Sequence, residues 1–238
     1  MQKPSMLFTG IFGAFAVSCG AMVLLPFSQL GGLQPQVTWD EGQNSPSDVY
    51  PQERHLAGRA AYVAQGCFYC HTQEVRDPQY GPDMERGWGP RRTVARDYIF
   101  EEVPLLGSLR LGPDFANYGA TAKIAQKDGS EKTVRMWRNE HEDDPKKPAE
   151  RNEQWIYKHL FNPRAIVSDS KCQSYRFLFE RVRIGAAPSP DAVASDGRYE
   201  YIPTLEAEHL ARYLLSQDRR HELKEAPTVI KPKEAPKK

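Results

Sequence analysis

The chain has 238 residues, with 32 Lys or Arg and 31 Asp or Glu, so its net charge at neutral pH is +1. This balance excludes a generic nucleic-acid-binding protein, which needs a basic excess, and a chain that its own charge keeps disordered. The negative mean hydropathy excludes a protein with several membrane spans. Four cysteines are too few for a disulfide scaffold of this length.

The first predicted element is a membrane helix. Residues 6–25 are apolar and uncharged, and about 20 such residues suffice to cross a bilayer core. A signal peptide usually has a shorter apolar core, and the residues before Cys19 fit a lipoprotein signal poorly, so we expect residues 1–30 to be a retained anchor. Lys3 on the short leading side favours a cytoplasmic N-terminus. We therefore expect a single-pass protein of a bacterial inner membrane, with its C-terminal domain in the periplasm.

The rest of the chain is expected to be one soluble domain between two irregular segments. Residues 31–51 are rich in Gly, Pro, Gln and Ser, which predicts an extended linker. Residues 219–238, with their mixture of Lys, Glu, Ala and Pro, predict a disordered tail. No strand-rich region is expected in the domain, residues 52–218. Its predicted elements are helices over 53–65, 152–161 and 205–217, a loop over 73–113 and a charged insertion over 127–150.

One motif points to a cofactor. Residues 67–71 read Cys-Phe-Tyr-Cys-His, which is the pattern of c-type haem attachment. Cys67 and Cys70 can each form a thioether to one haem vinyl group, and His71 can reach the iron as the proximal ligand. A zinc half-site would need two further ligands at a matching spacing, and the sequence has no second C-x-x-C. A redox dithiol would need no histidine at this position. The motif therefore predicts one covalent haem c.

The residues around this motif resemble a class I cytochrome c domain. Gly58 and Tyr62 precede it as in the first helix of that family, where the small glycine lets the terminal helix cross closely. Residues 112–115, Gly-Pro-Asp-Phe, resemble the family's Gly-Pro-x-Leu. By this resemblance the Pro113 carbonyl accepts the Nδ1 proton of His71 and fixes its tautomer. The implied fold class is all-α: one N-terminal transmembrane helix plus a class I cytochrome c domain with a loop insertion.

A narrower resemblance covers about two-thirds of the chain. Over this part, the chain is similar to the membrane-anchored mono-haem subunit II of cbb3-type cytochrome c oxidases. The resemblance implies an electron-transfer subunit that takes electrons from a further cytochrome c and passes them to the catalytic haem–copper subunit, which reduces oxygen. This chain has no histidine cluster for copper and no complete active site. The matching stretches are 58–76, 110–119, 155–164 and 203–217.

The sixth iron ligand is where the sequence departs from this family. Relatives carry a Met-Pro pair after Asn-Pro-Arg, whereas here Cys172 and Gln173 follow, with Cys172 eight residues after Arg164. Three interpretations are open: Cys172 binds the iron as a thiolate, another residue binds it, or the iron is five-coordinate. Arg164 is a candidate to pair with a haem propionate, because Arg forms paired charge-assisted hydrogen bonds. The candidates for a sixth iron ligand other than Cys172 are Met84, Met136, His141 and His159.

The resemblance favours a relay of electrons to a terminal oxidase. The same relay could serve a complex like nitric oxide reductase, because the residues that distinguish the two lie in the catalytic subunit. A different class of function is a membrane-anchored haem sensor of gas or redox state, in which a change of ligation is the signal. A stand-alone anchored cytochrome is the remaining alternative.

Overall fold

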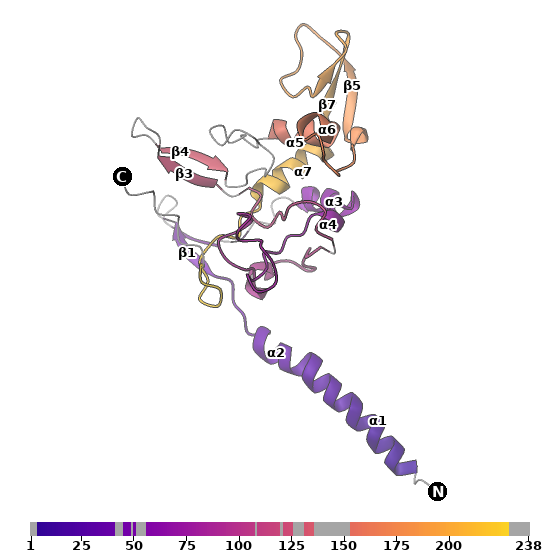
Figure 1. The fold of residues 1–238 in the computed structure, drawn as a ribbon, viewed down its shortest axis with the longest axis vertical. Coiled ribbons are helices and arrows are strands. Elements are labelled where there is room, and N and C mark those ends of the chain that lie inside the picture. Colours follow the sequence, from indigo (N-terminus) through magenta and orange to yellow (C-terminus); the bar gives the residue numbers. More distant parts are fainter. Residues whose placement is uncertain are drawn as a thin grey trace. The chain divides into compact units, whose positions relative to one another are not determined.

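The computed structural model describes residues 4–40, 45–48, 50, 56–107, 109–119, 121–125, 131–135 and 153–228 (Figure 1). The chain divides into two compact units. The first contains Met1–Asp48 and Ala95–Glu102, and the second contains Val49–Val94 and Val103–Lys238. The two units are described separately below.

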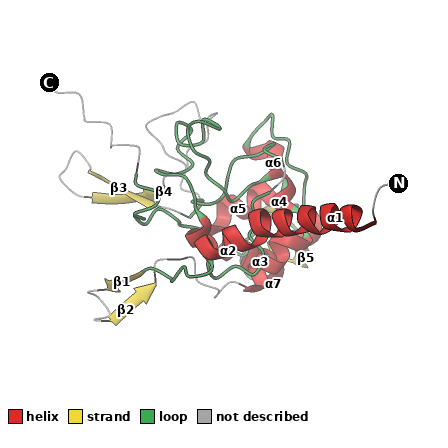
Figure 2. Ribbon diagram, turned by 90° about the horizontal axis from the view of Figure 1, so that it is seen from below, coloured by secondary structure: helices red, strands yellow, loops and turns green. Residues whose placement is uncertain are grey.

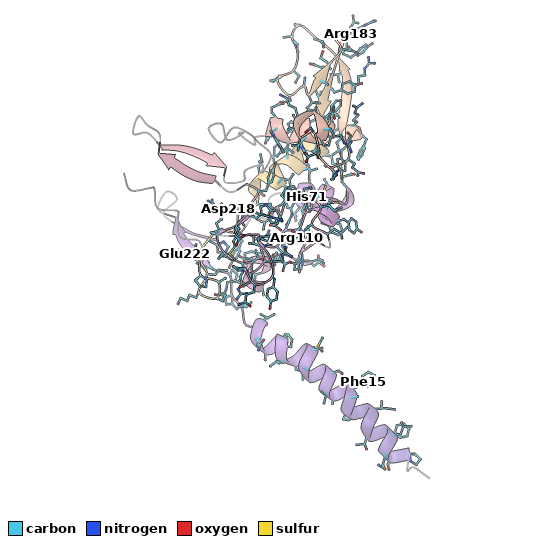
Figure 3. The ribbon with its side chains drawn as sticks, viewed as in Figure 1. Phe15, His71, Arg110, Arg183, Asp218 and Glu222 are labelled. Carbon is cyan, nitrogen blue, oxygen red and sulfur yellow. The ribbon has the colours of Figure 1, made fainter. Side chains whose placement is uncertain are left out.

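The first unit begins with a long apolar helix. Helices α1 (Pro4–Cys19) and α2 (Leu25–Leu30) are joined by one π-helical turn, Gly20–Leu24. The wider turn ends at Leu24, two residues before Pro26, which has no amide hydrogen, and the Leu25 N–H bonds to the Gly20 carbonyl. Apolar side chains such as Phe15 are exposed along this helix (Figure 3). In the part of the chain that the structure describes, it is the one helix long and apolar enough to cross a membrane.

Short elements complete the first unit. Strands β1 (Val37–Asp40) and β2 (Ser45–Asp48) form an antiparallel pair, and a 3-10 turn spans Ala95–Tyr98. Both strands lie within residues 31–51, for which the sequence predicts an extended linker. The Arg96 guanidinium donates to the Gln34 carbonyl and so ties the 3-10 turn to the segment that follows α2.

The second unit is built around three helices that pack together. These are α3 (Leu56–Ala64), α5 (Glu153–Phe161) and α7 (Leu205–Ser216), and both α3 and α5 contact α7 (Figure 2). Two single-turn helices, α4 (Cys67–Cys70) and α6 (Pro163–Ile166), follow α3 and α5. The three helices predicted within the domain are therefore confirmed, with ends that differ by at most three residues.

The crossing of α3 and α7 explains why a glycine occupies position 58 in α3. A Cβ atom at Gly58 would lie 2.5 Å from Cβ of Tyr213, so the two backbones can approach this closely only over a residue without a side chain. Beside it, Tyr62 is fully buried, with its ring centroid 5.5 Å from that of Tyr213. The Thr204 side chain caps α7 by accepting the Ala207 N–H. The predicted close crossing of the soluble domain's first and last helices, α3 and α7, is confirmed.

A small sheet corrects the all-α expectation, which is only partly confirmed. Strands β5 (Phe179–Arg183), β7 (Tyr199–Pro203) and β6 (Ala194–Ser195) form an antiparallel sheet in that order. It packs on the helices through aromatic rings, with the centroids of Phe179 and Phe161 5.3 Å apart. These strands are short, and residues 184–198 separate β5 from β7, so local sequence patterns indicated neither strand. A further antiparallel pair is β3 (Thr121–Ala125) with β4 (Glu131–Arg135).

The packed chain continues past residue 218, where the sequence predicts a disordered tail to begin. Arg219, Leu223 and Ala226 are buried. The buried Arg91 side chain donates from Nε to the His221 carbonyl over 2.8 Å, which holds this segment to a loop 130 residues earlier. Residues 229–238 lie outside the described residues, as does most of the predicted charged insertion over 127–150.

Candidate haem site

The attachment motif forms a single helical turn. Helix α3 is followed by Gly66, whose left-handed backbone (φ 68°) redirects the chain into α4. Cys67 and Cys70 are the first and last residues of α4, and residues three apart on a helix are neighbours on one face. Both thiols are free. The His71 N–H bonds to the Cys67 carbonyl over 2.9 Å, so the structure brings all three motif residues into one turn.

The His71 ring is held so that one nitrogen remains available. Its Nδ1 atom lies 2.9 Å from the Pro113 carbonyl oxygen. A carbonyl oxygen can only accept, so Nδ1 carries the proton and Nε2 carries the lone pair. The Tyr62 hydroxyl donates to the His71 carbonyl over 2.7 Å, and the Phe115 ring stacks on the imidazole with centroids 3.9 Å apart. These contacts fix both the backbone and the plane of the ring.

The surroundings of His71 suit a metal ligand. Burial lowers its pKa to about 4, although the bond to Pro113 opposes this shift. The imidazole is therefore neutral at pH 7, which is the form that binds metal ions. The ring lies directly against the bare backbone of Gly112, where an added Cβ would come within 2.7 Å of Nδ1. Two free thiols followed by a neutral, oriented imidazole fit the covalent attachment and proximal ligation of a c-type haem.

A buried carboxylate that sequence reasoning missed joins the two halves of this site. Asp114 accepts the Thr72 hydroxyl over 2.5 Å and the backbone N–H groups of Glu74 and Ala116 over 2.7 and 2.8 Å. Burial raises the pKa of Asp114 to about 6, and these hydrogen bonds oppose that rise. The Phe115 N–H also donates to the Thr72 carbonyl over 2.8 Å. The sequence signal that could have identified Asp114 is its position as the acidic residue of the Gly-Pro-Asp-Phe stretch.

A second buried carboxylate organises the loop that follows the motif. Asp83 receives hydrogen bonds from Arg76 Nη2 over 2.9 Å and from Arg110 Nη1 over 2.6 Å. Arg110, which Figure 3 labels, also donates to the Glu74 carbonyl over 2.8 Å. Burial raises the pKa of Asp83, but the two guanidinium groups outweigh it and hold the pKa below its ordinary value. The ion pairs thereby connect residues 76–83 to the segment before Gly112.

This ion-pair cluster predicts an acid-dependent stability. Because the folded-state pKa of Asp83 is depressed, its contribution is present above about pH 4 and is lost as the pH falls through the folded-state pKa. We expect Asp83→Asn to lower the free energy of unfolding by about 3 kcal/mol at pH 7, and this cost to shrink at pH 3. Denaturant unfolding of the haem-loaded chain in detergent measures both values. Asp196→Asn, in the exposed ion pair with Arg181, is the control and should change little. An equal cost of Asp83→Asn at both pH values would contradict the prediction.

Cys172 lies near the attachment turn. Burial raises its pKa to about 11; the nearby Cys70 thiol adds to this rise, and Arg164 opposes it. Burial raises the pKa of Cys67 to about 12, and Cys172 is the next largest cause. The Cys172 side chain packs against the helical core, and its Sγ lies 3.5 Å from the Gln173 carbonyl oxygen. The structure thus brings Cys172 within electrostatic reach of both motif thiols and of Arg164, which is itself exposed.

The other candidate ligands have different surroundings. Met84 is buried in a small cluster with Val75 and Ala116, next to the segment that carries Pro113. The His159 ring stacks on Trp155 with centroids 4.9 Å apart. Within the described ranges, no three His, Cys, Asp or Glu side chains converge as a metal-binding group. The remaining candidates, Met136 and His141, lie outside the described residues.

Comparison with protein-family models matches more than half of the chain to a known family. The model of a family described as cytochrome c oxidase, mono-heme subunit/FixO matches residues 12–151, which is more than half of the chain. The matched range contains the motif turn and Pro113, whereas Arg164 and Cys172 lie beyond it. A search of curated proteins returned no match.

Proposed function

Because this chain belongs to the FixO family of mono-haem cytochrome c oxidase subunits, we propose that it is a membrane-anchored c-type cytochrome that relays electrons to the catalytic haem–copper subunit of a terminal oxidase. The observation that carries this proposal is the geometry of His71. Its Nδ1 bond to Pro113 leaves Nε2 available to ligate a metal, and the two free thiols of Cys67 and Cys70 precede it in the chain. Its electron donor is proposed to be a further cytochrome c.

Each residue of the motif has a separate task in this proposal. The Cys67 and Cys70 thiols would each add across a vinyl group, so that sulfur bonds to one vinyl carbon and the proton goes to the other. His71 would ligate the iron through Nε2, and the Pro113 carbonyl would hold its tautomer. The bound haem supplies a one-electron ferric–ferrous couple. Cys172 is proposed as the sixth ligand and Arg164 as a propionate partner.

An exposed apolar surface beside the attachment turn supports association with another subunit. We call this the 103–111 surface; its exposed apolar side chains are Val103, Leu106, Leu109 and Leu111. The Leu109 N–H donates to the Tyr69 carbonyl over 3.1 Å, and the Gly112 N–H donates to the Cys70 carbonyl over 3.0 Å. These two bonds hold residues 109–112 against the attachment turn, where the haem would be bound. Apolar side chains are typical of the core of a protein interface. We propose that the catalytic subunit covers it.

A charge placed on the 103–111 surface tests this contact. We expect Leu109→Lys to lower the amount of haem b that co-purifies with each haem c by several-fold, because the lysine must be desolvated in the interface. Leu205→Lys, at a comparably exposed leucine at the start of α7, is the matched control and should leave the ratio unchanged. Equal haem b to haem c ratios in the two variants would exclude this surface as the contact.

The proposed function itself is tested by a reduced-minus-oxidised visible spectrum. The tagged full-length chain is solubilised gently from its native membranes, and the haem c band is expected together with the haem b bands of a catalytic subunit. Oxygen uptake by the same preparation is expected. Uptake of NO without uptake of oxygen would replace the terminal oxidase with a nitric oxide reductase-like complex. A haem c band without haem b in several mild detergents would overturn the subunit role and favour the stand-alone cytochrome or the sensor.

A further inference from the structure

We infer that Asp114 is a positioning residue. Its carboxylate positions the Pro113 carbonyl and thereby orients the hydrogen bond that this carbonyl accepts from the His71 imidazole. The consequence is a lower reduction potential of the haem. The inference rests on the proposed function, because it requires His71 to be an iron ligand.

The geometry places Asp114 at both ends of the His71–Pro113 contact. Its Oδ2 atom accepts the Thr72 hydroxyl and the Glu74 N–H, and Thr72 directly follows His71. Asp114 itself directly follows Pro113, and its Oδ1 atom accepts the Ala116 N–H two residues on. One side chain thus joins the backbone that leaves the imidazole to the loop that carries the accepting carbonyl. It acts together with the backbone hydrogen bonds from Gly112 to Cys70 and from Phe115 to Thr72, which flank Pro113, and the separation between Nδ1 and the Pro113 carbonyl oxygen is 2.9 Å.

A carboxylate is suited to this task. All three of its partners donate, and an ionised Asp can accept at both oxygens with no proton of its own. An amide at the same position would turn its NH₂ group toward at least one of the donors. Asp114 is almost fully buried, so the free-energy cost of its desolvation must be offset by these bonds. A neutral residue that only filled space would avoid this cost.

Two effects on the iron act in the same direction. A firm Nδ1–H hydrogen bond makes the imidazole a stronger electron donor, which favours the ferric state. The negative charge of Asp114 in a buried site also favours the more positive ferric haem. Both effects lower the reduction potential, so removing the carboxylate should raise it.

The experiment compares Asp114→Asn with the wild-type full-length chain purified in detergent. We expect a positive shift of the haem midpoint potential at pH 8 and changed g values in the electron paramagnetic resonance spectrum of the ferric haem, which report the axial imidazole. Asp83→Asn is the matched control: it removes another buried carboxylate, whose hydrogen bonds go to Arg76 and Arg110. The control should lose stability but keep the wild-type g values.

Thr72→Val keeps the inference testable if Asp114→Asn fails to bind haem. It removes one donor to the carboxylate without changing the charge, and we expect a smaller positive shift with altered g values. Wild-type g values in Asp114→Asn, or in Thr72→Val where the first variant lacks haem, would overturn the inference. A pyridine haemochrome assay separates the two claims, because absence of haem c from the wild-type chain would refute the proposed function instead.

Discussion

Replacing Cys67 and Cys70 together with serine should remove most of the folded protein from the membrane. Without the two proposed thioethers the haem would not be held covalently, and His71 would lose the iron that it is proposed to ligate. Because cofactor binding contributes directly to the free energy of folding, the haem-free chain should be largely unfolded and degraded. We expect the steady-state level to fall by about tenfold or more. Immunoblots of membranes carrying the tagged chain measure it.

The membrane helix provides the matched control for this experiment. Cys19→Ser makes the same substitution at an exposed cysteine far from the motif in sequence, and the protein level should stay at that of the wild type. Limited proteolysis of any Cys67→Ser, Cys70→Ser protein that remains in the membrane measures how compact it is. A normal level of a compact, protease-resistant chain without haem would show that the fold does not need the cofactor.

Replacing Cys172 with methionine should raise the haem midpoint potential. A thiolate ligand donates electron density to the iron and stabilises the ferric state, whereas a methionine thioether raises the potential. We expect an increase of at least about 0.1 V, which is a small part of the ~0.8 V range over which axial ligands set haem potentials. The electrostatic interaction of Cys172 with both motif thiols motivates the substitution. A potentiometric titration of the full-length chain gives the two midpoints.

Cys172→Ser distinguishes ligation from packing in this test. It nearly preserves side-chain size but removes the sulfur, so the reduced haem should bind CO much more readily than the wild type if Cys172 occupies the sixth position. Equal midpoints for the wild type and Cys172→Met, together with unchanged CO binding in Cys172→Ser, would assign the sixth position to another group or to none.

Several features of this protein could be predicted from the sequence because their signals are local. The attachment motif is confined to residues 67–71, and a single helical turn suffices to bring its cysteines to one face. The helices over 56–64, 153–161 and 205–216 carry apolar residues at helical spacing. The close crossing at Gly58 was predictable because a small residue within a helix permits the approach of another backbone.

The strands and the packed C-terminal segment could not be predicted in this way. Strand β5 pairs with β7 across residues 184–198, and neither strand is longer than five residues. The residues after 218 have the composition of a disordered tail, yet Leu223 and Ala226 are buried in the fold. Such features depend on partners that lie far away along the chain.

The same division applies to the candidate haem site. The sequence by itself predicted covalent haem attachment, because two thiols and an imidazole at this fixed spacing have few other uses. Only the tertiary structure decided how the imidazole is held, since Pro113 and Asp114 lie about 40 residues from His71 and Thr72. It also decided that Cys172 comes close to Cys67 and Cys70. The physical reason is that spacing along the chain determines contacts within one helical turn, whereas more distant contacts require the packed core.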